Sequence, residues 1–262
     1  MTQTFVGKTA LVTGATSGIG RAFAEVLAHR GMDLVVSGRD SSRLAQIAED
    51  LHEDAGSNVE ILVADLSDRA QVDLVANRAA LEDIALVVNN AGYGLATPFV
   101  GGDLASEQAL LDVLVTAVMR ISHAALPGLV ERDFGGIINV SSVAGWLSSG
   151  TYSAAKSYVT TFSESLAMQL RESNAHVMAL CPGFTRTEFQ QRAGMNTETI
   201  PEILWLDPHE VVQEALLDFA AAKAVSVPSV QYKTLGIAAQ YLPRPLVRIF
   251  STLERNYRNL PR

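Results

Sequence analysis

Apolar positions in this chain follow two alternating spacings. Short runs rich in β-branched residues recur, and most are followed by a longer stretch in which apolar residues return every three or four positions. The first spacing is typical of buried strands, and the second of helices with one apolar face. The runs predict strands at 8–13, 33–37, 59–64, 84–89, 136–141, 176–180 and 224–228. The stretches predict helices at 18–30, 41–55, 68–78, 105–132, 152–172 and 208–222, the fourth with a break near Pro127.

This alternation predicts the architecture. Parallel strands need crossover connections, and helices in those crossovers cover both faces of the sheet. We therefore expect an α/β fold with a doubly wound parallel sheet of about seven strands. A length of 262 residues suits a single domain over 1–262. Within it we interpret 184–222, which starts without clear periodicity, as an excursion from the sheet. Residues 233–262 form a predicted C-terminal helical extension, interrupted by Pro243 and Pro245.

Composition narrows the classes of function. A hydrophobic fraction of 48% supports a sizeable core and excludes a mainly disordered chain. The net charge of −8 argues against nucleic-acid binding, which needs a basic surface. One cysteine, Cys181, excludes an intrachain disulfide, and the five histidines lack ligand spacing, so no metal site is expected. We found no basic leader and no run of about 18 uncharged apolar residues, so we expect a cytoplasmic protein without a transmembrane helix.

Charge is distributed unevenly along the chain. Residues 231–262 carry six basic side chains and one acidic one, whereas the rest of the chain is strongly acidic. Two interpretations stay open for this tail. It is a helical extension packed on the domain, or it makes a weak contact with an anionic membrane surface or a partner.

The clearest chemical signal is the segment 13–20, Thr-Gly-Ala-Thr-Ser-Gly-Ile-Gly, which joins the first predicted strand to the first predicted helix. Glycines allow a tight turn and a close approach of the backbone to a pyrophosphate, and the helix N-terminus offers free N–H groups. The spacing is G-x-x-x-G-x-G. The alternative is a plain turn between strand and helix. The position of the segment at the first strand–helix junction favours dinucleotide binding.

The end of the second predicted strand bears on the choice of cofactor. An acid at this point would bind a ribose 2′-hydroxyl and favour NAD, whereas an arginine accommodates a 2′-phosphate. The strand ends in Ser37-Gly38-Arg39, so the sequence predicts a preference for NADP through Arg39. Asp40 follows directly and could weaken that preference by repulsion. A solvated surface charge is the alternative for Arg39.

A proton-transfer site is indicated by Tyr152 and Lys156. Residues four apart share a helix face, so the phenol and the ammonium can point into one cleft. A neighbouring cation favours the phenolate and makes proton exchange with a carbonyl or alcohol feasible. Ser142 follows the strand that precedes this helix and supplies a hydroxyl at the carboxyl edge of the sheet.

Together these motifs resemble the short-chain dehydrogenases/reductases, which have a single Rossmann-type domain. The resemblance runs from about residue 5 to 190 and also rests on Asp65-Leu66, on 89–92 (Asn-Asn-Ala-Gly) and on 182–187 (Pro-Gly-Phe-Thr-Arg-Thr). It implies that Tyr152 is the general acid/base, that Lys156 lowers its pKa and holds the nicotinamide ribose, and that Ser142 binds the substrate oxygen. The implied cofactor-binding residues are Gly14, Thr16, Ser17, Gly18, Ile19, Gly20, Arg39, Asp65, Leu66, Asn90, Tyr152, Lys156, Thr185 and Thr187.

The resemblance assigns parts of the cofactor to particular residues. Asp65 would contact the adenine, Asn90 the ribose region on the adenosine side, and Thr187 the nicotinamide carboxamide or the phosphates. The implied activity is hydride transfer between NADP(H) and a carbonyl or alcohol compound.

Two departures from the family pattern matter. Leu114 stands where the family usually has an asparagine that anchors a water in a proton relay. Ser142 and Tyr152 are ten positions apart, where about thirteen is usual, so the loop 143–151 is short. The alternative function is therefore a cofactor-binding protein with little turnover, such as a sensor or scaffold.

An apolar substrate pocket is expected beside the excursion. Its candidate lining residues are Leu95, Phe99, Trp146, Phe189, Met195, Leu204 and Trp205. They suit an apolar small-molecule carbonyl or alcohol compound. An apolar stripe of Phe162, Leu166 and Leu170 follows the helix of Tyr152, and in the family this helix commonly forms a subunit interface. A homo-oligomer, a dimer or a tetramer, is expected from this resemblance; ordinary core packing is the alternative.

Overall fold

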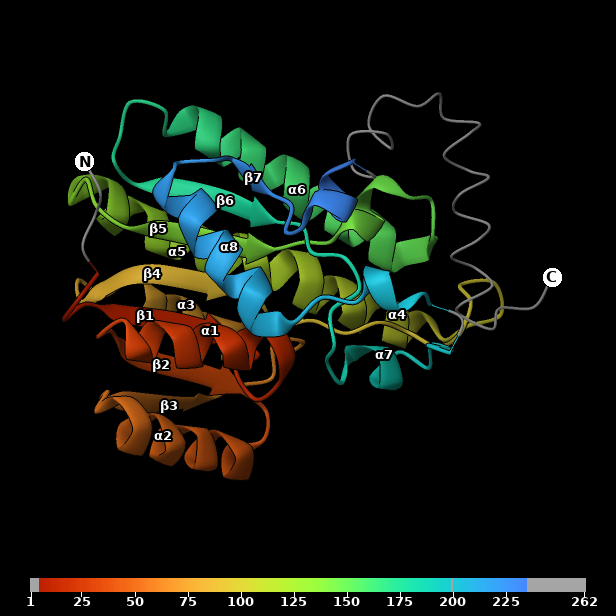
Figure 1. Cartoon of the computed structure of the whole chain (residues 1–262), viewed down its shortest axis with the longest axis horizontal. Coiled ribbons are helices and arrows are strands. Elements are labelled where there is room, and N and C mark those ends of the chain that lie inside the picture. The colour runs from red at the N-terminus through yellow and green to blue at the C-terminus, as the bar shows by residue number, and fades with distance from the viewer. Residues whose placement is uncertain (1–4, 199, 235–262) are drawn as a thin grey trace.

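A computed structural model describes residues 5–198 and 200–234 of the chain (Figure 1). Seven parallel strands form one sheet in the order β3-β2-β1-β4-β5-β6-β7. Their bounds are Thr9–Thr13, Asp33–Gly38, Val59–Val63, Ile84–Asn89, Gly136–Val140, His176–Leu180 and Val225–Ser226 for β1 to β7. The predicted doubly wound α/β fold is thereby confirmed. The strand order reverses between β1 and β4, which opens a crevice at the carboxyl ends of these strands.

Helices cover both faces of the sheet because successive strand residues point to opposite sides. In β1, for example, Val12 belongs to one buried cluster and Leu11 to the other. The first face carries α1 (Gly18–His29), α2 (Ser41–Ala55) and α8 (Pro208–Ala220). The second carries α3 (Arg69–Ala79), α4 (Leu104–Leu111), α5 (Val118–Glu131) and α6 (Gly150–Gln169).

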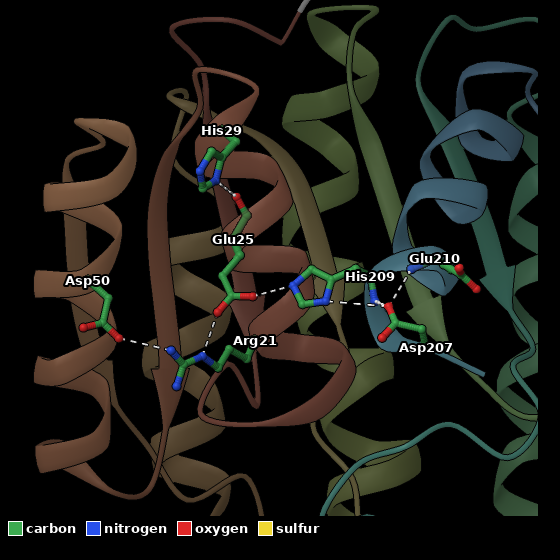
Figure 2. Close-up of polar contacts among 7 residues, drawn as sticks. All are labelled: Arg21, Glu25, His29, Asp50, Asp207, His209 and Glu210. Carbon is green, nitrogen blue, oxygen red and sulfur yellow. Dashed lines mark hydrogen bonds and ion pairs between the residues drawn. The ribbon is translucent and has the colours of Figure 1, made fainter. Parts of the chain in front are cut away.

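Polar side chains connect the three helices of the first face. Arg21 of α1 pairs with Asp50 of α2 at 3.1 Å, and Nε2 of His209 in α8 lies 2.7 Å from Oε2 of Glu25 in α1 (Figure 2). Arg21 also bonds Glu25 at 2.7 Å, so the contacts form one network. Because these groups are partly exposed, they orient the helices more than they stabilise them.

The helix predicted over 105–132 is interrupted at a different place from the one expected. A π-helical turn, Asp112–Ala117, separates α4 from α5, whereas Pro127 lies inside α5 without breaking it. Pro127 and His123, whose carbonyl loses its helical partner, are both on the exposed side. Water can therefore satisfy that carbonyl, and the prediction of a break near Pro127 was wrong.

The segment Leu104–Glu131 is also long and apolar enough, by length and composition, to cross a membrane, although the sequence alone had suggested no such stretch. In this structure it packs on the sheet. Leu110, Leu114, Ile121 and Leu129 are each at most 1% exposed, in the same cluster as residues of β4 and β5. Its apolar character is that of a core helix.

The excursion after β6 contains two short helical turns, α7 (Phe189–Arg192) and the 3₁₀ turn Glu202–Leu204, before α8 begins at Pro208. Residues 235–262, which include nearly all of the predicted extension and its basic tail, lie outside the described residues. The predicted homo-oligomer and the membrane contact stay predictions.

Candidate active site

A cavity of about 550 Å³ lies at the carboxyl ends of β1, β2, β4, β5 and β6. It brings together residues from every motif identified in the sequence. Those that line it are Gly14, Thr16, Ser17, Gly18, Ile19, Arg39, Asp65, Leu66, Asn90, Ser142, Tyr152, Lys156, Thr185 and Thr187. Gly20 is the one predicted site residue outside this lining. The individual roles assigned to these residues stay predictions.

The glycines of the first loop are required by close packing. A Cβ on Gly14, whose φ is +65°, would lie 2.8 Å from the Cα of Ala91. A Cβ on Gly18, with φ of +57°, would lie 2.8 Å from the side chain of Thr187. A Cβ on Gly20 would lie 2.3 Å from the carbonyl oxygen of Gly14. Gly20 therefore allows the loop to pack closely on the start of α1, although it does not line the cavity.

The start of α1 is left open for an anion. Ser17 occupies the N-cap position but makes no side-chain capping hydrogen bond, and no acidic residue lies in the first turn. N–H groups at a helix start carry a partial positive charge and bind phosphate when no side chain occupies them. Ser17 and Gly18 both line the cavity, so this helix end faces the space in which a dinucleotide would lie.

Asn90 holds the loop in place. Its side-chain amide donates to the carbonyl oxygens of Thr13 and Gly14 at 3.0 and 3.1 Å. The Thr13 hydroxyl in turn accepts from the backbone N–H groups of Asn90 and Ala91. Sequence resemblance assigned Asn90 to the ribose region; in the structure its amide also fastens β1 to β4.

The adenosine end is marked by Arg39 and Asp65, whose charged groups are 3.9 Å apart. Burial alone would raise the pKa of the Asp65 carboxyl, but hydrogen bonds from Ser67 and the charge of Arg39 outweigh it and lower that pKa. Arg39 is 73% exposed, so its guanidinium can turn toward a ligand.

The carboxylate of Asp40, which could have repelled a phosphate, caps α2. It accepts from the N–H groups of Ser42 and Arg43 and from the hydroxyl of Ser42. The Ser42 hydroxyl contributes most to lowering the pKa of this carboxyl. Part of its charge is therefore engaged with the helix, and the expected repulsion at Arg39 is reduced.

Tyr152 and Lys156 lie on the first two turns of α6, and both point into the cavity. The ammonium of Lys156 is 5.8 Å from the centre of the Tyr152 ring and donates to the carbonyl oxygen of Val140 at 2.7 Å. Burial lowers the pKa of Lys156 to about 8. Phe189 packs against the Tyr152 ring in a tilted arrangement, with the centroids 5.5 Å apart.

Ser142 begins the short loop that leads to α6. Its hydroxyl oxygen accepts from the N–H of Ala144 at 3.1 Å and caps the 3₁₀ turn Val143–Trp146. Gly145 in this turn lies directly on α6, because a Cβ there would be 2.9 Å from the backbone nitrogen of Ser157. The loop, three residues shorter than the family usually has, is thus folded down onto the helix.

Three further residues around the site have contacts that the sequence did not predict. Ser141 is buried and donates to the carbonyl oxygen of Lys156 at 2.7 Å, which fixes α6 against β5. Gln190 donates to the carbonyl oxygen of Thr185 at 2.9 Å. Ser141 belongs to the Ser141-Ser142 pair that matches the family, but the sequence assigned a role only to Ser142.

Tyr232 is the third. Its hydroxyl accepts from the N–H of Phe184 at 3.0 Å and donates to the carbonyl oxygen of Leu204 at 2.8 Å. Its ring covers Gly183, where a Cβ would be 2.0 Å from it. Burial raises the pKa of Tyr232 to about 12, so the hydroxyl stays protonated and can donate. No motif pointed to this residue, which lies beyond the segment that resembles the family.

The predicted substrate wall is correct in part. Trp146, Phe189, Met195 and Leu204 line the cavity. The other three candidates do not line it: Leu95 packs against the core, Phe99 is 62% exposed, and Trp205 contacts Phe184 and Arg186. Apolarity alone could not separate residues facing the cavity from those packing beside it.

Comparison with known proteins places the chain in a family. Residues 8–198 match the family model described as short chain dehydrogenase, so the chain belongs to this family of oxidoreductases. Sulfoacetaldehyde reductase 2 of Chromohalobacter salexigens is 37% identical over 186 residues, which are 68% of this chain and 73% of that protein. Inactive hydroxysteroid dehydrogenase-like protein 1 of Homo sapiens is 30% identical over 252 residues, which are 90% of this chain and 73% of that protein.

Two solved structures of similar fold contain a nicotinamide cofactor. A short-chain dehydrogenase from Sphingobium yanoikuyae in complex with NADPH is 35% identical, with a TM-score of 0.82 over 89% of this chain and 94% of that chain. A short-chain dehydrogenase/reductase from Burkholderia phymatum in complex with NAD is 28% identical, with a TM-score of 0.78 over 90% and 93%. They support a nicotinamide cofactor in this family's site.

Proposed function

We propose that this protein is an NADP(H)-dependent oxidoreductase that interconverts a carbonyl and an alcohol, with Tyr152 as general acid/base. The observation that carries the proposal is the position of Tyr152, Lys156 and Ser142 in the same cavity as the glycine-rich loop. That loop and the uncapped start of α1 fit a dinucleotide. When bound, the cofactor supplies the hydride chemistry, and the protein supplies orientation and electrostatics.

The chain's own residues account for the proton. The Lys156 ammonium near the Tyr152 ring favours the phenolate over the phenol, because opposite charges attract. With a pKa of about 8, Lys156 keeps this charge at neutral pH. Tyr152 then gives a proton to the substrate oxygen in reduction or takes one in oxidation. Ser142 would donate to the same oxygen once its hydroxyl proton turns from the carbonyl oxygen of Pro182, which accepts from it at 3.5 Å.

The substrate we propose is an apolar small molecule. The cavity that contains Tyr152 is also lined by the apolar residues Trp146, Phe189, Met195 and Leu204. A pocket with a mostly apolar lining and a few polar groups binds ligands through burial and orients them through those groups.

Loss of the phenol tests the chemistry. We expect Tyr152→Phe to abolish NADPH consumption over a panel of apolar ketones and aldehydes while leaving NADPH binding measurable. Tyr158→Phe is the matched control, because Tyr158 lies on the same helix, is 39% exposed and stacks on Phe162. Equal turnover of Tyr152→Phe and the control would reject the assigned acid/base.

The NADP preference rests on Arg39 at the tip of β2 and on Asp40 being engaged as a helix cap. Arg39→Ala should weaken NADPH binding by at least tenfold and NADH binding little, because hydrogen bonds between charged groups contribute about 1.5–3 kcal/mol. Equal losses for the two cofactors would refute a contact to the 2′-phosphate.

A second candidate is a cofactor-binding protein with little turnover. The observation that favours it is Leu114, which is 1% exposed and touches Gly92, where the family usually has an asparagine. Tight NADPH binding together with no turnover on the same panel would favour this function over the first.

A further inference from the structure

An ion pair joins the start of α2 to the residue that precedes α7. Nη1 of Arg43, in the first turn of α2, lies 3.2 and 3.4 Å from the two carboxylate oxygens of Glu188. Glu188 precedes α7 and also pairs with Arg192 at the end of that turn. The pair links segments that are 145 positions apart in the sequence. Neither residue belongs to a motif found in the sequence.

Neither residue of this pair lines the cavity, but each is close in the sequence to residues that do. Arg43 follows Arg39 by four positions, and Arg39 lines the cavity. Glu188 lies between Thr187 and Phe189, which also line it. Thr187 in turn touches the glycine-rich loop, since a Cβ on Gly18 would be 2.8 Å from it. The pair therefore links the start of α2 to the segment that touches the glycine-rich loop.

Arg43 can exchange the carboxylate of Glu188 for a phosphate at little cost. Arg43 and Glu188 are 49% and 45% exposed, and ion pairs in such settings are weak because water solvates both ends. An arginine binds phosphate through parallel, charge-assisted hydrogen bonds, which are stronger. If Arg43 leaves, Glu188 keeps Arg192 as its partner, so no carboxylate is left unpaired. Asp40, the other acid facing Arg43 at 3.7 Å, is engaged at the helix start.

We propose that Arg43 is a phosphate-binding residue of the dinucleotide site and that Glu188 competes with the phosphate for it. The inference rests on the proposed function, since it needs a bound dinucleotide. Two phosphates have the required chemistry, the 2′-phosphate of NADP and the pyrophosphate shared with NAD. The Glu188 carboxylate thereby lowers the affinity for the cofactor, because it competes with a cofactor phosphate for Arg43.

The experiment measures dissociation constants of NADPH and NADH by fluorescence titration of the full-length protein. Arg43→Gln should weaken NADPH at least tenfold, and Glu188→Gln should tighten it about threefold, because the rival charge is gone. In the double variant the gain from Glu188→Gln should vanish, since the competition runs through Arg43. An effect on NADPH alone identifies the 2′-phosphate, and an equal effect on NADH identifies the pyrophosphate.

Arg21→Gln is the matched control. Arg21 is an arginine of similar exposure that pairs with Glu25 and Asp50 on the outer face of α1 (Figure 2). The proposal is overturned if Arg43→Gln weakens binding no more than this control, or if Glu188→Gln fails to tighten it. The proposed function still stands if Arg39→Ala remains selective for NADPH in that case. A wild-type protein that binds neither cofactor would overturn both.

Discussion

Replacing Lys156 with methionine tests whether this lysine is retained for chemistry at a cost in stability. The side chain is 5% exposed, and burial lowers its pKa from 10.5 to about 8. Methionine is of similar length and carries no charge. We expect Lys156→Met to lose turnover. We also expect its stability, measured relative to that of wild type, to be higher at neutral pH than at alkaline pH.

The size of the effect follows from the two pKa values. Below pH 8 the lysine is charged in both the folded and the unfolded chain, so folding bears the full penalty of burying the charge. Each tenfold change in proton affinity is about 1.4 kcal/mol, so the penalty is about 3 kcal/mol. As pH rises, the folded lysine releases its proton first, and the penalty fades until the unfolded pKa of 10.5 is passed. Between neutral pH and pH 10, wild type should therefore gain about 2–3 kcal/mol from this group.

The assay is urea unfolding of wild type and Lys156→Met across this pH range, with the two free energies of unfolding subtracted at each pH. Subtraction cancels the groups that titrate in both proteins. The wild-type value minus the variant value should rise by about 2–3 kcal/mol toward pH 10. Lys8→Met, at an exposed lysine, calibrates the loss of one positive charge at the surface.

A difference that stays flat with pH would refute the reasoning, because it would mean that the folded protein holds the Lys156 proton as tightly as the unfolded chain. Retained turnover in Lys156→Met would separately refute the assistance that this ammonium is proposed to give Tyr152.

Two substitutions test the packing around the site. Gly183→Ala should destabilise the protein by about 1–3 kcal/mol in thermal or urea unfolding, because its Cβ would be 2.0 Å from the Tyr232 ring. Adding Tyr232→Ala should make the two effects clearly less than additive, and full additivity would contradict the contact. Leu114→Asn should destabilise by about 2–4 kcal/mol, since it places an amide in a buried apolar position, and should not raise kcat. A higher kcat would instead indicate that Leu114 limits proton supply.

Much of the fold could be predicted from local pattern because burial imposes its period on each element. Residues such as Leu11 and Val12 face opposite layers, so buried parallel strands appear as continuous apolar runs. The glycine-rich loop was recognisable for a similar reason. A tight turn with close approach of other backbone excludes side chains, and this requirement is local enough to be written in consecutive residues.

The break in the fourth helix shows where local reasoning ends. Proline signalled a break at Pro127, yet the irregular turn lies at Asp112–Ala117, where the sequence has no glycine or proline. Whether a proline interrupts a helix depends on whether water can reach the carbonyl left without a partner. That exposure is a property of how the helix packs on the sheet.

In this protein, local sequence determined the succession of strands and helices along the chain. It also determined the motifs Thr13–Gly20 and Tyr152–Lys156, because the constraints on these residues act within a few positions of chain. Tertiary structure alone decided that Tyr232 covers Gly183 and that Arg43 meets Glu188. These partners are brought together by chain crossings whose geometry depends on all the intervening packing. Single residues that meet across such distances leave no periodic trace in the sequence.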